Sequence, residues 1–454
     1  MRPKLLTIAA LVAGAGILLC GCRGISTSGE KSSRHDLGAV TAKYRPDNQL
    51  PALPELTPES GFSNYLMFAV LNQPQVAAAY YDWAAAVENI TVARSLPDPK
   101  LTFELYAGDI LTSLMPGLTA DIPGPGKLSA RAAAASAESR AKYFQFATAV
   151  QQTAFAVEKS FYPLHFLEAK LEVNRQTLAL LASLETLARA QNEVGRGTLQ
   201  DVLRAQIEQE KLKTETANLE DSRQVLLAQF KAALGLHGEQ ADPPVPTQAE
   251  FTETKMSDEE LFAAALKQNP RLLAMAAEIK VADASIRVAQ KDKIPDFTAG
   301  GRVDVKANPL IWNPQFSMSL PIWRDKLAAE LAAAQAGKRA AEARLSAEQI
   351  NLAVDFAEQA YLIREANREL ALLRERLLPR ARQSLEVSRA AYRSGQVDFL
   401  NVIDAERSLL NFQLDEIAAQ TQRQIARAQL TLLVAGVPPE NAPLLKPETS
   451  QTAQ

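Results

Sequence analysis

"RSGQVDFLNVIDAERSLL", residues 393–410, is similar to a stretch about 200 positions earlier, "VGRGTLQDVLRAQIEQEK", residues 194–211. Each stretch begins with a glycine turn and continues into an apolar helical stripe. Glycine adopts positive φ more readily than any other residue. We therefore predict that Gly195, Gly197 and Gly395 adopt this conformation and reverse the chain tightly between long antiparallel helices.

The similarity between the two halves continues on both sides of these turns. The stretch "LNQPQVAAA" (71–79) resembles "LKQNPRLLAM" (266–275), "SLPDPKLTFELY" (95–106) resembles "KIPDFTAGGRV" (293–303), and "DIPGPGKLSARAAAA" (121–135) resembles "SLPIWRDKLAAELAAA" (319–334). Four matches in the same order indicate a tandem duplication. The period is too long for a solenoid unit, so each half is predicted to be a whole structural subunit.

These matches, together with the N-terminal pattern described below, predict six segments. They are a lipoprotein signal peptide at 1–21, a lipidated extension at 22–60, a first repeat at 61–240, a linker at 241–256, a second repeat at 257–437 and a tail at 438–454.

Each half contains one very long helical pattern, from about residue 128 to 192 and from 326 to 392. A helix of about 65 residues is roughly 95–100 Å long, far longer than a globular domain of this mass requires. Pro163 and Pro379 fall inside these patterns and are predicted to kink or break the helices locally.

The segments between the helices alternate in polarity instead. In "KLTFELYAG" (100–108), three apolar side chains alternate with polar ones, and similar alternation recurs at 111–122, 297–307 and 312–322. A period of two predicts half-buried strands, so each half offers one hairpin and the chain offers four strands. The predicted fold class is mostly α with a β part. A small soluble sheet is the alternative reading of these strands.

The N-terminus is typical of an exported protein. Arg2 and Lys4 precede an apolar run at 5–19 that is short for a transmembrane helix. The run ends in "LCGC", which resembles the bacterial lipobox, so Cys22 is predicted to become the lipidated first residue. Arg23 follows where an Asp would favour retention at the inner membrane, which favours the outer membrane. An ordinary secretory signal is the alternative.

An outer-membrane anchor favours a membrane location for the strands. Strands of this length with one polar face are typical of a transmembrane barrel. Four strands cannot close a barrel, and hydrocarbon does not tolerate open sheet edges. Several copies of the chain are therefore expected to share one barrel if these strands lie in lipid.

The chain resembles the TolC-type outer membrane efflux family over roughly residues 60–437. The resemblance rests on the tandem repeat, "LPDP" before the first hairpin, "IPGPGK" after it, and "YRSGQVDFLNVIDAERSLL" in the second half. It implies a homotrimer with a twelve-stranded barrel in outer-membrane lipid and a periplasmic α-barrel of long helices. It also implies docking with a periplasmic adaptor and an inner-membrane pump, expected to be of the RND type. "GPGK" is similar to the heavy-metal branch of the family.

The same resemblance points to a gate near the glycine turns, where the adaptor is expected to dock. The family often carries an Asp-x-x-Asp pair after the second turn. Asp404 matches its second member, Asn401 departs from the first, and Asp201 is the counterpart of Asn401 in the first half. Asp404 either faces the lumen, giving three carboxylates around one axis in a trimer, or pairs with an arginine such as Arg407.

Polar residues on the predicted strands are candidates for the lining of the barrel. They are Glu104, Arg302, Asp304 and Lys306. Their mixed charge predicts a weakly selective pore, although solvated residues on any strand face would look the same.

Composition argues against other functions. The net charge is −3, so no basic surface favours nucleic acid. The histidines His35, His165 and His237 are scattered, and no cofactor or metal site is expected. No catalytic motif is present, so an enzyme is not expected. The main alternative to an efflux channel is a lipid-anchored periplasmic helical scaffold without a pore.

Overall fold

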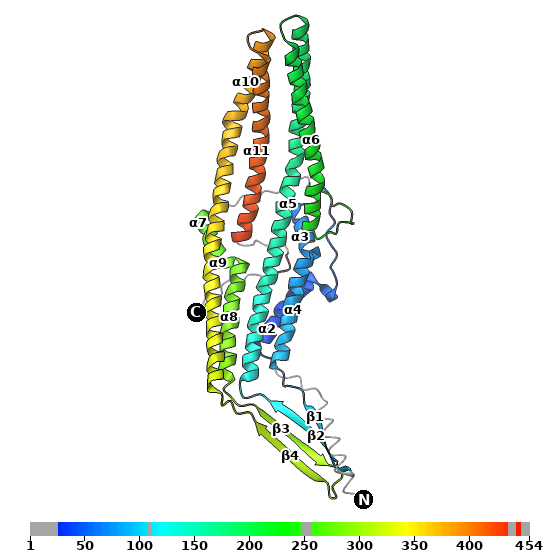
Figure 1. The fold of residues 1–454 in the computed structure, drawn as a ribbon, viewed down its shortest axis with the longest axis vertical. Coiled ribbons are helices and arrows are strands. Elements are labelled where there is room, and N and C mark those ends of the chain that lie inside the picture. The colour runs from blue at the N-terminus through cyan, green and yellow to red at the C-terminus, as the bar shows by residue number, and fades with distance from the viewer. Residues whose placement is uncertain (1–25, 108–110, 247–256, 435–441, 446–454) are drawn as a thin grey trace. The chain divides into compact units, whose positions relative to one another are not determined.

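A computed structural model describes residues 26–107, 111–246, 257–434 and 442–445 of the chain (Figure 1). Cys22 lies outside the described residues. The chain divides into two compact units, which are considered separately below. The first comprises the described residues of Met1–Gly38, Asp82–Lys142 and Ala276–Ala343, and the second those of Ala39–Tyr81, Tyr143–Met275 and Arg344–Gln454.

The two halves of the chain repeat one order of elements, namely two helices, a hairpin, a long helix and a return helix. In the first half these are α3 (Phe62–Asn72), α4 (Pro74–Arg94), β1 (Lys100–Ala107), β2 (Leu111–Ile122), α5 (Lys127–Glu193) and α6 (Leu199–Ala233). In the second half they are α7 (Asp258–Gln268), α8 (Pro270–Lys291), β3 (Phe297–Asp304), β4 (Ile311–Met318), α9 (Arg324–Leu372), a π-helical segment (Leu373–Leu377), α10 (Leu378–Arg393) and α11 (Phe399–Val434). This content of long helices and four strands confirms the predicted fold class.

One amide side chain in each half lies at the break between the two helices that precede the hairpin, α3 and α4 in the first half and α7 and α8 in the second. Gln73 and Asn269 each precede the proline that begins a helix, so the preceding helix ends there. The Gln73 amide donates to the carbonyls of Ala232 and Ala233, and the Asn269 amide donates to the Leu433 carbonyl. These carbonyls end the return helices, where no intrahelical donor remains.

The two prolines of the long helices behave differently. Helix α5 continues through Pro163, so of the predicted kink or break, the break does not occur there. Its neighbours Phe161, Tyr162 and Leu164 are buried, and this packing holds the helix together despite the missing hydrogen bond. Before Pro379 the helix changes to the π segment, in which Leu378 donates to the carbonyl five residues back. The second helix is therefore interrupted near its proline, as predicted.

The helix α2 (Ser28–Tyr44), which precedes the first repeat, is held to α4 by a charged cluster in the first unit. The Glu30 carboxylate is buried and accepts from Arg94 at 2.5 Å and from Thr91 at 2.8 Å, and Arg34 bonds both Glu30 and Glu88. The hydrogen bond from Arg94 is the main cause that lowers the pKa of Glu30 to about 2.

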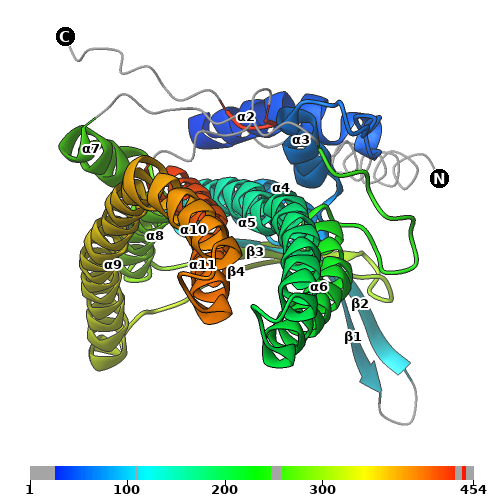
Figure 2. The ribbon, with the colours of Figure 1, turned by 90° about the horizontal axis from the view of Figure 1, so that it is seen from above.

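In the second unit, the helices meet in antiparallel pairs beside the glycine turns. Helices α10 and α11 lie side by side in both views (Figures 1 and 2). None of the helices in the described ranges has the length and apolar character needed to cross a membrane.

Candidate functional site: a two-faced sheet and paired helical turns

The four strands form one antiparallel sheet in the order β1-β2-β3-β4, which confirms the two predicted hairpins (Figure 1). Alternate residues of a strand point to opposite faces of its sheet. The register therefore gathers polar residues on one face, namely Lys100, Thr102, Glu104, Tyr106, Ser113, Thr119, Asp121, Thr298, Arg302, Asp304, Asn313, Gln315 and Ser317.

Arg302 and Glu104 form an ion pair that crosses an intervening strand. Arg302 of β3 lies opposite Gly117 of β2, which in turn lies opposite Thr102 of β1. A Cβ on Gly117 would stand 2.3 Å from Cγ of Arg302. Only a glycine leaves room for the arginine to pass over β2 and reach Glu104, with which it pairs. The structure thus brings two of the predicted lining residues together.

Two more contacts link strands on this polar face. Asp121 binds Lys100 of β1 at 2.8 Å and accepts from Thr298 of β3 at 2.8 Å. Asp304, a predicted lining residue, accepts from Ser113 of β2 at 2.8 Å. Two carboxylates of this face, Glu104 and Asp121, are therefore paired with cations from other strands, and Asp304 is held by a hydroxyl.

Lys306 lies elsewhere than predicted. Strand β3 ends at Asp304, and Lys306 follows in the β3–β4 connection, where its backbone N–H donates to the Asp304 carboxylate. The alternation in "GRVDVKA" predicted a longer strand, but this side-chain bond turns the backbone out of the ladder.

The opposite face of the sheet is apolar and exposed in the single chain. Phe103 is 65% exposed and Phe316 is 80% exposed. The other large exposed side chains of this face are Leu101, Leu105, Leu118, Ile122, Phe297, Trp312 and Met318. An apolar surface of this extent on a soluble protein marks a site of contact with lipid or protein.

The glycine turns in the second unit have the same backbone geometry in both halves. Gly195 and Gly395 have φ of 72° and 73°. The residue after each glycine, Arg196 or Gln396, donates to the carbonyl five residues earlier, at 2.8 and 2.9 Å. This pattern is a Schellman motif, which ends a helix on a left-handed residue. The prediction of positive φ is confirmed for Gly195 and Gly395.

The prediction for Gly197 is wrong, because its φ lies outside the positive region. Glycine is instead required there for space. A Cβ at this position would lie 3.1 Å from Cβ of Gln191 and 3.1 Å from the hydroxyl of Tyr392.

Asp201 holds the start of α6. Its carboxylate accepts from the backbone N–H of Thr198, whose hydroxyl accepts from the backbone N–H of Asp201, forming a capping box. The Tyr392 hydroxyl also donates to Asp201 at 3.3 Å, and burial raises the pKa of Tyr392 to about 12. Asp201 thereby links the two helical hairpins.

Asn401 and Asp404 are exposed on the first turns of α11. The Asp404 carboxylate is 60% exposed and lies 3.9 Å from Arg407. Arg407 binds Glu208 of α6 much more closely, with two hydrogen bonds of 3.1 and 2.6 Å. The second alternative for Asp404, an ion pair with Arg407, is thus a marginal contact. The Arg407 hydrogen bond lowers the pKa of Glu208.

Sequence reasoning missed Glu406, which lies two residues after the predicted gate residue Asp404. Glu406 is 2% exposed, and its Oε1 has no hydrogen-bond partner among the residues that the structure describes. Burial, with a smaller effect from Glu208, raises the pKa of Glu406 to about 7. A signal was present, since Glu406 follows Val402 by four positions and precedes Leu409 by three, on the apolar side of the helix.

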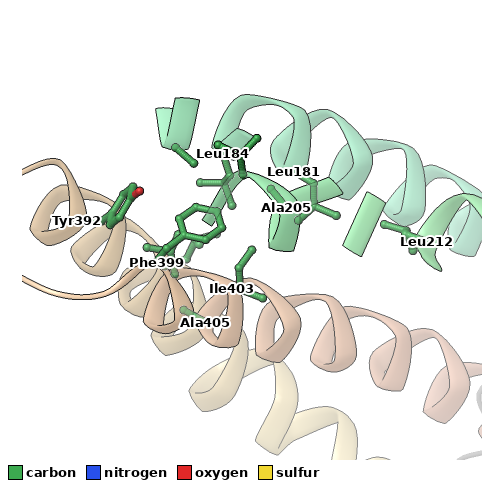
Figure 3. Close-up of a cluster of buried hydrophobic side chains, with 12 residues drawn as sticks. Leu181, Leu184, Ala205, Leu212, Tyr392, Phe399, Ile403 and Ala405 are labelled. Carbon is green, nitrogen blue, oxygen red and sulfur yellow. The ribbon is translucent and has the colours of Figure 1, made fainter. Parts of the chain in front are cut away.

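A hydrophobic cluster holds the two hairpins together near the turns (Figure 3). Leu184 of α5 and Ala205 of α6 pack with Phe399 and Ile403 of α11. Tyr392 meets Phe399 with ring centroids 5.1 Å apart. The predicted gate residues Asn401 and Asp404 therefore lie beside a buried apolar cluster to which both repeats contribute.

Within the described ranges, no three His, Cys, Asp or Glu side chains are placed to hold a metal ion together. The histidines His165 and His237 lie at separate positions, and the absence of a metal site over the whole chain stays a prediction.

These features define a class of protein: a duplicated pair of long helical hairpins carrying a sheet with one polar and one exposed apolar face. The chain belongs to the outer membrane efflux protein family, whose sequence model matches residues 68–236 and 261–436. Membership confirms the family resemblance found in the sequence and assigns the chain to the outer membrane.

Individual relatives are distant. The chain is 23% identical over 266 residues to the cobalt-zinc-cadmium resistance protein CzcC of Cupriavidus metallidurans. The aligned stretch covers 56% of this chain and 60% of the relative. The fold resembles crystal structures of CusC (TM-score 0.72, 18% identity, 86% and 99% of the two chains) and of a membrane protein from Pseudomonas aeruginosa (0.71, 20%, 82% and 89%).

Proposed function

We propose that this protein is the outer-membrane exit duct of a tripartite efflux pump, conducting small molecules or ions passively to the exterior. The observation that carries the proposal is the two-faced sheet in a member of the outer membrane efflux family. Its apolar face suits hydrocarbon, and its polar face, with the Glu104–Arg302 pair and Asp304, suits a water-filled lumen.

The proposed assembly is a homotrimer whose chains together supply twelve strands. A single chain leaves β1 and β4 with one neighbour each, and open edges are not stable in hydrocarbon. The long helices would line a periplasmic tunnel. Lipidation at Cys22 would add an anchor to outer-membrane lipid, but a lipid chain alone would not explain the sheet.

The proposed partners act at the glycine turns. A periplasmic adaptor would dock near Gly195, Gly197 and Gly395 and connect the duct to an inner-membrane pump of the RND type. Asn401 and Asp404 are exposed beside these turns, so they are available to a narrow lumen or to a partner. In a trimer, Asp404 would supply three carboxylates that favour cations.

Metal ions are the proposed cargo class, on the basis of the similarity to the cobalt-zinc-cadmium resistance protein. A conduit does not need to bind its cargo tightly, so this proposal does not depend on a metal site.

Purified protein in planar lipid bilayers tests the function. We expect heat-resistant trimers in detergent and stepwise single-channel conductance. A lipid-anchored scaffold would give neither, and that result would overturn the proposal in favour of the alternative. Growth of a deletion strain on graded cobalt, zinc and cadmium, with and without the gene, tests the cargo.

A further inference from the structure

The ion pairs Lys100–Asp121 and Glu104–Arg302 both lie on the polar face of the sheet, but they are held differently. Lys100 of β1 reaches Asp121 of the neighbouring strand β2, and the lysine side chain is 67% exposed. Arg302 of β3 reaches past β2 to Glu104 of β1, and the arginine side chain is only 30% exposed. On an open sheet face, such low exposure means that the arginine lies flat on the sheet instead of extending away from it.

The surface beneath the arginine explains how it lies. Gly117 is opposite Thr102 on one side and Arg302 on the other, so this row of three strands has no side chain at its centre. The Nε atom of Arg302 and the hydroxyl of Thr102 are both buried, with no hydrogen-bond partner among the described residues. Arg302 is therefore held against the sheet along its length and not only at its charged end.

The carboxylate of Glu104 is fixed by two partners. Its Oε2 pairs with Arg302, and its Oε1 accepts a hydrogen bond of 2.5 Å from the Tyr106 hydroxyl. Tyr106 lies two positions further along β1, so it belongs to the same face of the sheet. The two opposite charges thus stay next to each other on the surface of the sheet.

The pair lies between the two ends of the sheet. Lys100 and Asp121 mark the end at which the strands join the helices, because β1 follows α4 and β2 precedes α5. Asp304 is the last residue of β3 and marks the end at the β3–β4 connection. Glu104 and Arg302 are therefore placed along the middle of the polar face.

We infer that Arg302 cancels the field of Glu104 in the middle of the duct wall, so that the barrel does not select permeant ions by the sign of their charge. The inference rests on the proposed function, which turns the polar face toward the lumen and repeats it in every copy. A ring of like charges on a pore wall concentrates ions of the opposite sign, whereas two adjacent opposite charges leave only a weak field. A preference for cations would then come from other parts of the duct, such as Asp404.

Loss of either partner should expose the charge of the other one. Arg302→Gln leaves the Glu104 carboxylate uncompensated, and Glu104→Gln leaves the Arg302 guanidinium uncompensated, once per copy around the axis. Ion pairs at exposed positions contribute little to stability, so both variants are expected to fold. The two changes remove similar contacts and leave charges of opposite sign, which separates an electrostatic role from a structural one.

Reversal potentials in planar bilayers under a KCl gradient measure the ratio of potassium to chloride permeability. All proteins carry Asp404→Ala, so that the carboxylates near the turns do not dominate the ratio. We expect Arg302→Gln to raise the ratio roughly twofold or more and Glu104→Gln to lower it by a similar factor. The double variant should return to the value of the protein that carries Asp404→Ala alone.

A matched control removes a glutamate from a similar pair away from the sheet. Glu88 of α4 is bound by Arg34 of α2, and Glu88→Gln should leave the permeability ratio unchanged. The effects of the Glu104 and Arg302 variants should also shrink between about 0.1 M and about 1 M KCl, because the Debye length falls from about 10 Å to about 3 Å.

Chemical modification serves if the charge variants insert poorly. Glu104→Cys is first assembled into conducting channels and then treated with small thiol reagents that add either a negative or a positive charge. The negative reagent should restore the starting ratio, and the positive reagent should lower the ratio further. The protein without Glu104→Cys, treated in the same way, is the control for reaction at other cysteines.

Two results would contradict the inference in distinguishable ways. Conducting channels in which Arg302→Gln and Glu104→Gln leave the ratio unchanged, or shift it in the same direction, would overturn the inference while the proposed function stands. Absence of any conductance from the unaltered protein would remove the proposed function, and the inference with it.

Discussion

Glu406 shows how a single residue can make the turn region sensitive to pH. Its carboxyl group is buried beside Glu208 and has an unpartnered oxygen, so the protein favours the neutral form. A pKa that rises on folding gives a contribution to stability that is fully present below the ordinary value of 4.5. That contribution is lost as the pH rises through about 7.

We therefore expect Glu406→Gln to raise the free energy of unfolding at pH 8 by roughly 1–3 kcal/mol and to change it little at pH 4.5. Urea unfolding of both proteins at several pH values between 4.5 and 8 measures the difference. Glu210→Gln, at an exposed site on α6, is the control and should show no such trend. A pH-independent effect of Glu406→Gln would argue against the buried acid.

Gly395 provides a second test at the scale of one residue. A Cβ there would meet no atom of the described residues within 4 Å, so its φ of 73° is what opposes a side chain. We expect Gly395→Ala to destabilise the protein by about 1–2 kcal/mol in urea unfolding. Gly337→Ala is matched, since it also meets nothing but lies inside helix α9, and should stabilise by about 0.5–1 kcal/mol. Equal effects of the two changes would show that the turn is not strained.

At the scale of elements, α6 and α11 are joined by the Arg407–Glu208 pair and by the apolar cluster around Phe399 and Ile403. The pair links the two repeats across 199 positions of sequence, so it reports on whether the hairpins stay together.

Arg407→Ala should loosen this contact and increase amide hydrogen exchange in the first turns of α6 and α11, at about residues 199–210 and 399–410. Arg389→Ala is the control, because Arg389 pairs only with Glu386 of its own helix among the ion pairs of the described ranges. Exchange that changes equally in both variants would mean that the Arg407–Glu208 pair does not hold the hairpins. The reversal Arg407→Glu with Glu208→Arg should restore protection.

At the scale of the whole assembly, each exposed residue is present once per copy around the axis of the proposed homotrimer. A lone Asp404 is a solvated carboxylate, whereas several around one axis create a negative potential at a constriction.

We expect Asp404→Ala to reduce cation block of the open channel several-fold or to raise the open fraction in planar bilayers. Asp415→Ala, further along α11, should leave both unchanged. Unaltered cation block and open fraction in the Asp404 variant would exclude a role of Asp404 in gating. The conductance of the same variant would still show whether the protein forms a channel.

The duplication, the helical reversals and the four strands could be predicted from the sequence alone. Periodicity is a local property, and glycine and proline mark its ends, so Gly195, Gly395 and the alternation in "KLTFELY" could be interpreted without a partner. The family could also be identified, because its motifs recur in order along nearly the whole chain.

Which side chains meet depends on how the chain folds in three dimensions. Arg302 reaches Glu104 because Gly117 stands between them, and Tyr392 bonds Asp201 across two repeats. Glu406 is buried and lies near enough to Glu208 of α6 for the two charges to interact. Such contacts join residues about 190–200 positions apart, and they depend on strand register and helix packing. No local pattern encodes these distances, so Gly197 and Lys306 were placed wrongly by rules that consider only their neighbours in sequence.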